Sequence, residues 1–240
     1  MKWWEETCWV SPFVGSNPTP RSFDLILTKQ EKRMKIEDVV ESLKEKIDRD
    51  VKNNVAEFEK NKNLSKDEKF IELCFCILVA NSSMEKTFKI WKEIGYDFLR
   101  LSKEELAQKL KELGYRFYNR RAEYIIEARK KIDLLEEILR MSDEFEIRNK
   151  LVKSFKGIGW KEASHFLRNL GYKNFAIIDR HVLKVLKKFG IIENIPKSLS
   201  KKAYLDIENK LRFIAKALNM SLTELDFYLF YISSGKIPTK

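Results

Sequence analysis

The sequence predicts an all-α fold. From residue 34 onward, nearly every stretch repeats its apolar residues with a helical period. Glycine and proline are scarce, with 8 and 5 in 240 residues, and this disfavours long loops and many hairpins. Several periodic segments end at glycine, the residue that commonly follows the last turn of a helix. The length allows one large domain or two small ones with a buried core.

The helices are predicted in order along the chain. The amphipathic pattern starts at Met34 and predicts a helix over residues 34–60. Residues 66–83 combine a capped start with a strongly apolar run, which predicts a buried helix that ends near Asn81. Further helices are predicted over residues 85–95, 103–114, 119–140, 143–155, 161–171, 181–190, 200–218 and 221–235.

Residues 1–33 differ from the rest of the chain. They hold three of the five tryptophans and three of the five prolines, show no helical period, and lack the charged start and apolar core of a signal peptide. The hypothesis is that they are a non-native or unstructured extension and that the protein starts at or near Met34. The alternative is a short real extension that packs on the body. Intact mass of protein from its native source distinguishes the two, since a mass starting at Met1 would reject the hypothesis.

The composition points to a polyanionic partner. The formal charge of +11 and the pI of about 9.4 make nucleic acid the first candidate. A Lys/Glu-rich surface, common in proteins from hot environments, explains the charge equally well. Cys8, Cys74 and Cys76 form no disulfide framework, and Cys74 and Cys76 lie in an apolar run where we expect them to be buried. No run approaches the ~20 apolar residues of a membrane helix, so we expect a cytoplasmic protein.

Residues 143–171 read as helix, KGIGW, helix. Gly157 and Gly159 allow a tight hairpin, which points backbone N–H groups at the positive start of the second helix. A DNA phosphate fits there without any base-specific contact. This is the helix-hairpin-helix arrangement, and Lys153, Lys156 and Lys161 crowd it. Taken alone, the turn favours an ordinary tight connection between helices over a DNA site.

Three residues add chemistry to this turn. Lys161 is predicted in the first turn of the second helix, where the dipole disfavours an ammonium, and nucleophilic attack on a sugar carbon needs a neutral amine. Asp179 precedes the next helix and is predicted to be its N-cap. If it faces a cleft, its carboxylate also stabilises a developing sugar cation or moves protons. His181, two residues later, can donate to a phosphate.

The segment KGIGWKEASHFLRNLGYKNFAIIDRHVLKVL resembles the signature of the helix-hairpin-helix DNA glycosylase superfamily, and most closely the archaeal 8-oxoguanine glycosylase/AP lyase type. The resemblance covers the chain from Met34 to its end. By motif, it implies Lys161 as the nucleophile, Asp179 as the catalytic aspartate, and Gly157, Gly159 and His181 as phosphate contacts. The pair Ile177-Ile178 departs from the Gly-Pro type of many members.

The same resemblance assigns further DNA contacts. LVANSS resembles the segment whose polar residue fills the space left by a flipped base, which implies that Asn81 contacts the orphaned partner base; the alternative is a helix C-cap. GYRFYNRRAEYI resembles the segment near the damaged pair. It makes DNA-contact candidates of Arg116, Arg120 and Arg121, which otherwise form a solvated basic face.

The carboxy-terminal segment resembles the base pocket of 8-oxoguanine glycosylases. Asp226 and Phe230 match its polar and stacking residues, although human-type enzymes show Gln in place of Asp226. A carboxylate accepts the paired N1–H and 2-amino donors of guanine, and an aromatic ring stacks on a flipped base. Ordinary core packing is the alternative for Phe230. No cysteine follows Cys76, which argues against an iron–sulfur cluster of the endonuclease III type.

The resemblance implies a two-lobed helical protein with its active site in the cleft between the lobes. One lobe is predicted from residues 34–72 plus 179–240 and the other from residues 73–178. The expected function is excision of 8-oxoguanine from duplex DNA by Lys161 and strand cleavage by β-elimination. The resemblance implies no cofactor and no iron–sulfur cluster. The hairpin is able to hold a monovalent cation. We expect a monomer with no membrane partner. The alternatives are a glycosylase for another lesion, such as an oxidised pyrimidine, and a non-catalytic DNA-binding protein.

Overall fold

The computed structural model describes residues 35–237. The hypothesis about residues 1–33 and a start at Met34 lies outside this range. The described residues form eleven α-helices and two 3-10 helices and contain no strand, so the predicted all-α class is confirmed. The helices are α3 (Ile36–Lys60), η3 (Asn61–Asn63), α4 (Lys66–Val79), α5 (Met84–Ile94), η4 (Gly95–Leu99), α6 (Lys103–Glu112), α7 (Tyr118–Arg129), α8 (Ile132–Leu139), α9 (Glu144–Ser154), α10 (Trp160–Asn169), α11 (Arg180–Lys188), α12 (Lys201–Ala217) and α13 (Leu222–Ser234).

The predicted helices are found within a few residues of their expected bounds, with one correction. The single helix predicted over residues 119–140 is two helices, α7 and α8, which are separated at Lys130 and Lys131. The Lys131 N–H donates to the Ala128 carbonyl, and Lys131 then serves as the N-cap of α8. No glycine or proline marks this break, so the periodic pattern runs through it.

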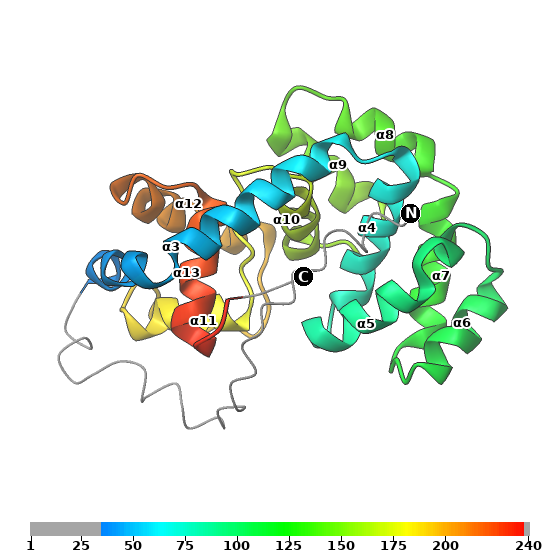
Figure 1. Cartoon of the computed structure of the whole chain (residues 1–240), viewed down its shortest axis with the longest axis horizontal. Coiled ribbons are helices and arrows are strands. Elements are labelled where there is room, and N and C mark those ends of the chain that lie inside the picture. The colour runs from blue at the N-terminus through cyan, green and yellow to red at the C-terminus, as the bar shows by residue number, and fades with distance from the viewer. Residues whose placement is uncertain (1–34, 238–240) are drawn as a thin grey trace. The chain divides into compact units, whose positions relative to one another are not determined.

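The chain forms two compact units, as the two-lobed prediction requires (Figure 1). As far as it is described, the first unit consists of residues 35–58 and 173–237, and the second of residues 59–172. These divisions differ from the predicted ones after residues 72 and 178. The predicted boundary after residue 72 falls within α4, and the boundary after Phe58 falls within α3, so each divides a continuous helix.

Helix α4 is the core of the second unit. It packs against α5, α7, α8 and α10 (Figure 1). Its residues from Phe70 to Val79 are all buried, and Cys74 and Cys76 have no exposed surface, as predicted. Burial raises the pKa of the Cys74 thiol well above its ordinary value. A Ser65–Glu68 capping box starts the helix, since each side chain bonds the other residue's backbone N–H.

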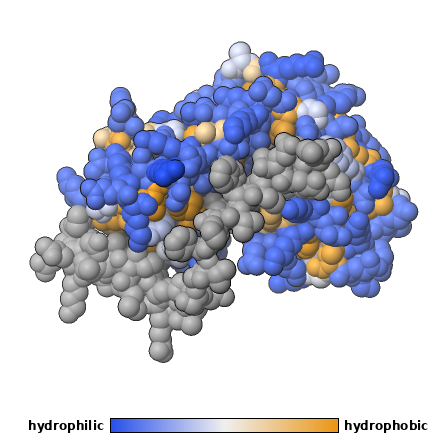
Figure 2. Space-filling view, viewed as in Figure 1, coloured by the Kyte–Doolittle hydropathy of each residue, from blue (hydrophilic) through white to orange (hydrophobic). Residues whose placement is uncertain are grey.

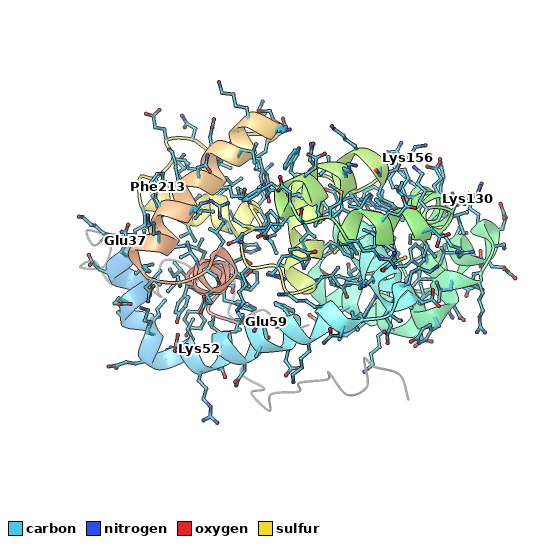
Figure 3. The ribbon with its side chains drawn as sticks, turned by 90° about the horizontal axis from the view of Figure 1, so that it is seen from above. Glu37, Lys52, Glu59, Lys130, Lys156 and Phe213 are labelled. Carbon is cyan, nitrogen blue, oxygen red and sulfur yellow. The ribbon has the colours of Figure 1, made fainter. Side chains whose placement is uncertain are left out.

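In the first unit, α13 packs against both α11 and α12. The Tyr228 hydroxyl of α13 donates to Asp48 of α3 at 3.0 Å, and Phe227 stacks on Phe58. Hydrophilic residues cover most of the visible described surface, with apolar residues in small separate patches (Figure 2). Among the large apolar side chains of the described chain, Phe213 on α12 is the most exposed, at 76% (Figure 3).

None of the helices in residues 35–237 combines the length and the apolar character needed to cross a membrane.

Candidate active site

The hairpin between α9 and α10 has the tight turn that the sequence predicts. Gly157 has a φ of +82°, a conformation that strains any residue with a Cβ. A Cβ on Gly157 would lie 2.7 Å from Cδ2 of Tyr124 and 3.2 Å from Nη1 of Arg121, both on α7. Glycine is therefore required here both by backbone conformation and by the close approach of α7.

We expect Gly157→Ala to destabilise the protein by about 2–4 kcal/mol, because a left-handed alanine and an overpacked contact add their costs. Gly190→Ala is the matched control. Gly190 has a φ of +70°, but a Cβ there would meet no atom within 4 Å. It should cost only about 1–2 kcal/mol. Thermal unfolding of both variants measures the difference, and equal losses would show that the contact with Tyr124 relaxes freely.

The start of α10 differs from the simple phosphate site that the sequence predicts. The Gly159 N–H, expected to face a phosphate, donates to the Glu162 carboxylate at 3.2 Å. Glu162 lies at the third position of α10, where glutamate commonly caps a helix in this way. Because Gly159 has no side chain, only this half of a capping box is present. A phosphate at Gly159 therefore has to approach or displace a carboxylate.

We expect Glu162→Gln to tighten DNA binding. Glutamine keeps an oxygen that can cap Gly159 but removes a charge that repels phosphate by on the order of 1 kcal/mol, which is about fivefold in Kd. Glu68→Gln, at the same position of the α4 capping box, removes one charge equally from the second unit. Titration of labelled duplex at fixed salt compares the two. The interpretation fails if both variants tighten binding alike, since net charge alone would then be responsible.

Lys161 is the second residue of α10, and its side chain is half-buried. Of the two other lysines predicted to crowd the hairpin, Lys153 is exposed, and Lys156 is exposed but paired with Glu127 at 3.0 Å. The hydrogen bond that Lys156 (labelled in Figure 3) donates to the Glu127 carboxylate raises the pKa of Lys156, which stays charged. Lys156 is thus an exposed cation that already has an acidic partner, and Lys161 is the lysine placed at the helix start.

Asp179 is the N-cap of α11, as predicted. Its Oδ1 accepts the backbone N–H groups of His181 at 2.8 Å and of Val182 at 2.9 Å. The residues leading to it, 175–178, are buried and lie outside any helix. Tyr204 of α12 holds this segment, since its hydroxyl donates to the Ala176 carbonyl at 2.6 Å and accepts the Ile178 N–H at 3.4 Å.

The other predicted residues of the first unit lie on α11 and α13. His181 is exposed, its Nδ1 lies 2.9 Å from the Ser233 hydroxyl, and its ring lies 5.4 Å from that of Phe230. A phosphate would therefore meet the other ring nitrogen, Nε2. Asp226 is buried, with 7% of its surface exposed, and lies one helical turn before the partly exposed Phe230.

The remaining candidates lie in the second unit. Asn81 follows the end of α4 with a φ of +63° and an exposed side chain. Asparagine tolerates this left-handed conformation better than most residues. Arg116 and Arg120 are exposed, as both sequence interpretations expect. Arg121 fits neither, because only 7% of it is exposed and its Nη2 donates to the Ala80 carbonyl at 2.9 Å.

The predicted site residues are thus divided between the two units. Asn81, the three arginines, the hairpin glycines and Lys161 belong to the second unit, and Asp179, His181, Asp226 and Phe230 to the first.

Comparison with known proteins decides the family. The family model described as 8-oxoguanine DNA glycosylase matches residues 51–220. The chain belongs to the 8-oxoguanine DNA glycosylase family. Within the family, it is 49% identical over 204 residues to the 8-oxoguanine DNA glycosylase/AP lyase of Methanocaldococcus jannaschii, covering 85% of this chain and 97% of that protein. It is also 49% identical to the Korarchaeum cryptofilum enzyme of the same name, over 78% of this chain and 89% of that protein.

Solved structures of family members agree. The crystal structure of the M. jannaschii 8-oxoguanine glycosylase/lyase in complex with a 15mer DNA containing 8-oxoguanine matches with a TM-score of 0.82 and 47% identity, covering 85% of this chain and 99% of that one. The 8-oxoguanine DNA glycosylase of Thermotoga maritima matches with a TM-score of 0.79 and 43% identity, over 84% and 97%. The predicted family and fold are therefore confirmed.

Some residues around the site were not predicted as part of it. Glu162 could have been found, since a glutamate three residues after a helix-starting glycine is a capping signal. Tyr204 and Ser233 carry no local signal, because their partners lie 28 and 52 residues away in the sequence. Within residues 35–237, no group of three His, Cys, Asp or Glu side chains is arranged to hold a metal ion.

Proposed function

We propose that this protein excises 8-oxoguanine from duplex DNA and then cleaves the strand at the resulting abasic site. The observation that carries the proposal is the 49% identity over nearly the whole M. jannaschii enzyme, whose name states both activities. The hairpin adds physical support, because it combines a tight glycine turn with a half-buried lysine in the first turn of the next helix. The formal charge of +11 favours binding to the DNA backbone.

Lys161 is the proposed nucleophile. Its neutral amine attacks C1′ of the damaged nucleotide as the bond to the base breaks, and the base leaves with a proton. The resulting amine opens the sugar to a Schiff base, and loss of a C2′ proton then expels the 3′ phosphate by β-elimination. Asp179 is proposed to stabilise the positive charge that develops on the sugar and to move protons between these steps.

The remaining candidates bind DNA in this proposal. Gly157, Gly159 and His181 hold phosphates, and Asn81, Arg116 and Arg120 contact the duplex around the damaged pair. Phe230 stacks on the flipped base, and the Asp226 carboxylate accepts the N1–H and 2-amino groups of the guanine. The enzyme acts as a monomer and without a cofactor, and a monovalent cation at the hairpin remains part of the proposal.

Borohydride trapping tests this function. Wild-type protein is incubated with sodium borohydride and duplexes that carry 8-oxoguanine, thymine glycol or no lesion. A covalent adduct with the 8-oxoguanine duplex alone is the expected result. An adduct with the thymine glycol duplex alone would show that the substrate is an oxidised pyrimidine. Binding to the duplexes without any adduct would show that the protein binds DNA but does not attack it.

A further inference from the structure

The side chain of Arg121 lies between two turns of the second unit. Its Nη2 donates to the carbonyl of Ala80, the residue before Asn81, at 2.9 Å. Its Nη1 lies 3.2 Å from the position that a Cβ on Gly157 would take. The two nitrogens of one planar guanidinium thus meet the Asn81 turn and the hairpin turn. With only 7% of its surface exposed, Arg121 is a poor candidate for a direct DNA contact.

On the Asn81 side, Arg121 completes the end of α4. The last carbonyls of a helix lack partners within it. Here the Val79 carbonyl accepts the Ser82 N–H at 3.1 Å, the Leu78 carbonyl accepts the Tyr115 hydroxyl, and the Ala80 carbonyl accepts Arg121. Because Ala80 is bonded to Asn81, holding its carbonyl fixes the peptide plane from which the exposed Asn81 side chain projects.

On the hairpin side, Arg121 and Tyr124 form the surface on which Gly157 rests. The guanidinium lies 5.7 Å from the centre of the Tyr124 ring, and the edge of this ring makes the close approach to Gly157. A guanidinium presents donors along two edges in a fixed plane, whereas a lysine ammonium is a single point on a flexible stem. One arginine is therefore bonded to the Asn81 turn and lies next to the hairpin turn.

We infer that Arg121 is a positioning residue that couples phosphate binding at the hairpin to contact between Asn81 and the orphaned base. The inference rests on the proposed function for the role of Asn81. Its physical basis has two steps. When the hairpin binds the DNA backbone, it fixes the position of the adjacent guanidinium, and the guanidinium in turn fixes the position of the Asn81 turn. Loss of Arg121 should therefore reproduce the loss of the Asn81 side chain, although Arg121 itself reaches no base.

A double-mutant cycle on binding tests the coupling. The probes are two duplexes with a tetrahydrofuran abasic analogue, placed opposite cytosine or opposite a second analogue that offers no base. The Kd for the duplex without an opposite base, divided by the Kd for the duplex with cytosine, measures the orphan-base contact without any catalytic step. This quotient is called the ratio below. The variants are Asn81→Gly, which removes the amide while glycine keeps the left-handed backbone, Arg121→Met and the double variant.

We expect each single variant to lower the ratio about fivefold to tenfold and the double variant to lower it no further. Arg129→Met is the matched control, since Arg129 also lies on α7 and donates to a backbone carbonyl, that of Phe98 at 2.9 Å. It should keep the wild-type ratio. Arg121→Lys retains the charge and the stem and should lose the ratio as Arg121→Met does, which keeps the test open if the methionine variant folds poorly.

Two outcomes would overturn the coupling: a wild-type ratio in the Arg121 variants, or losses that multiply in the double variant. Excision of 8-oxoguanine, measured on the same samples, reports separately on the proposed function. If the wild-type protein excises nothing but the cycle is non-additive, the proposed activity fails and the coupling stands. If excision is normal but Arg121 leaves the ratio unchanged, the coupling fails alone.

Discussion

Lys161→Gln should lower excision of 8-oxoguanine by about a thousandfold or more and should abolish the borohydride adduct. Glutamine has a similar length, but its amide nitrogen cannot attack a sugar carbon or form a Schiff base. The fold should not suffer, because the Lys161 side chain is only half-buried and makes no hydrogen bond or ion pair with another described residue. Single-turnover excision and trapping measure the two effects.

The control for charge is Lys150→Gln, an exposed lysine on α9 in the same unit. Both variants lose one positive charge, so both should weaken duplex binding by a similar small factor, while only Lys161→Gln should lose the chemistry. A covalent adduct that persists in Lys161→Gln would place the nucleophile on another amine of the chain.

Asp179→Asn should lower excision by about 10²–10⁴-fold, the range expected when a general acid–base group or a charge-stabilising group is lost. Asparagine is as good an N-cap as aspartate, so it can keep the bonds to the His181 and Val182 N–H groups and thereby α11. The substitution therefore separates the structural use of this side chain from the proposed chemical one. Rates at saturating enzyme, with thermal unfolding on the same samples, measure both.

Asp143→Asn is a close match for this variant. Asp143 is the N-cap of α9 and accepts two N–H groups in the same pattern, from Phe145 at 2.9 Å and Glu146 at 3.3 Å. It should unfold at a similar temperature to Asp179→Asn and retain wild-type excision. The role proposed for Asp179 is lost if the two variants slow excision equally, because disturbance of a helix start would then explain both.

The helices could be predicted closely because their signals are local. Serine N-caps such as Ser65, Ser102 and Ser221 each bond a backbone N–H three residues later, and apolar periodicity covers the turns that follow. The break between α7 and α8 could not be predicted, because helix-favouring residues continue across it. The boundary between the two units after Phe58 could not be predicted either. It lies within α3, and the sequence of a continuous helix does not show where the helix passes from one unit to the other.

The candidate site divides in the same way. Gly157 and the cap at Asp179 depend on backbone conformation and immediate neighbours, which sequence patterns describe well. The burial of Arg121 depends on Ala80, 41 residues earlier, and the support of residues 176–178 depends on Tyr204 of α12. Such contacts exist only once the helices have packed, so single-sequence reasoning assigned Arg121 to the surface.

The cap at Asp179 has a consequence for the timing of catalysis. Both backbone N–H groups bond the same oxygen, Oδ1, so Oδ2 takes no part in the cap and is the oxygen available for the role proposed for Asp179. If the Asp179 side chain adopted another rotamer, α11 would lose its N-cap, and the protein would lose about 1 kcal/mol of stability. Because α11 packs on α13, the carboxylate and the residues proposed to read the base are parts of one packed assembly. The carboxylate is thus set in place by folding itself, before any DNA arrives.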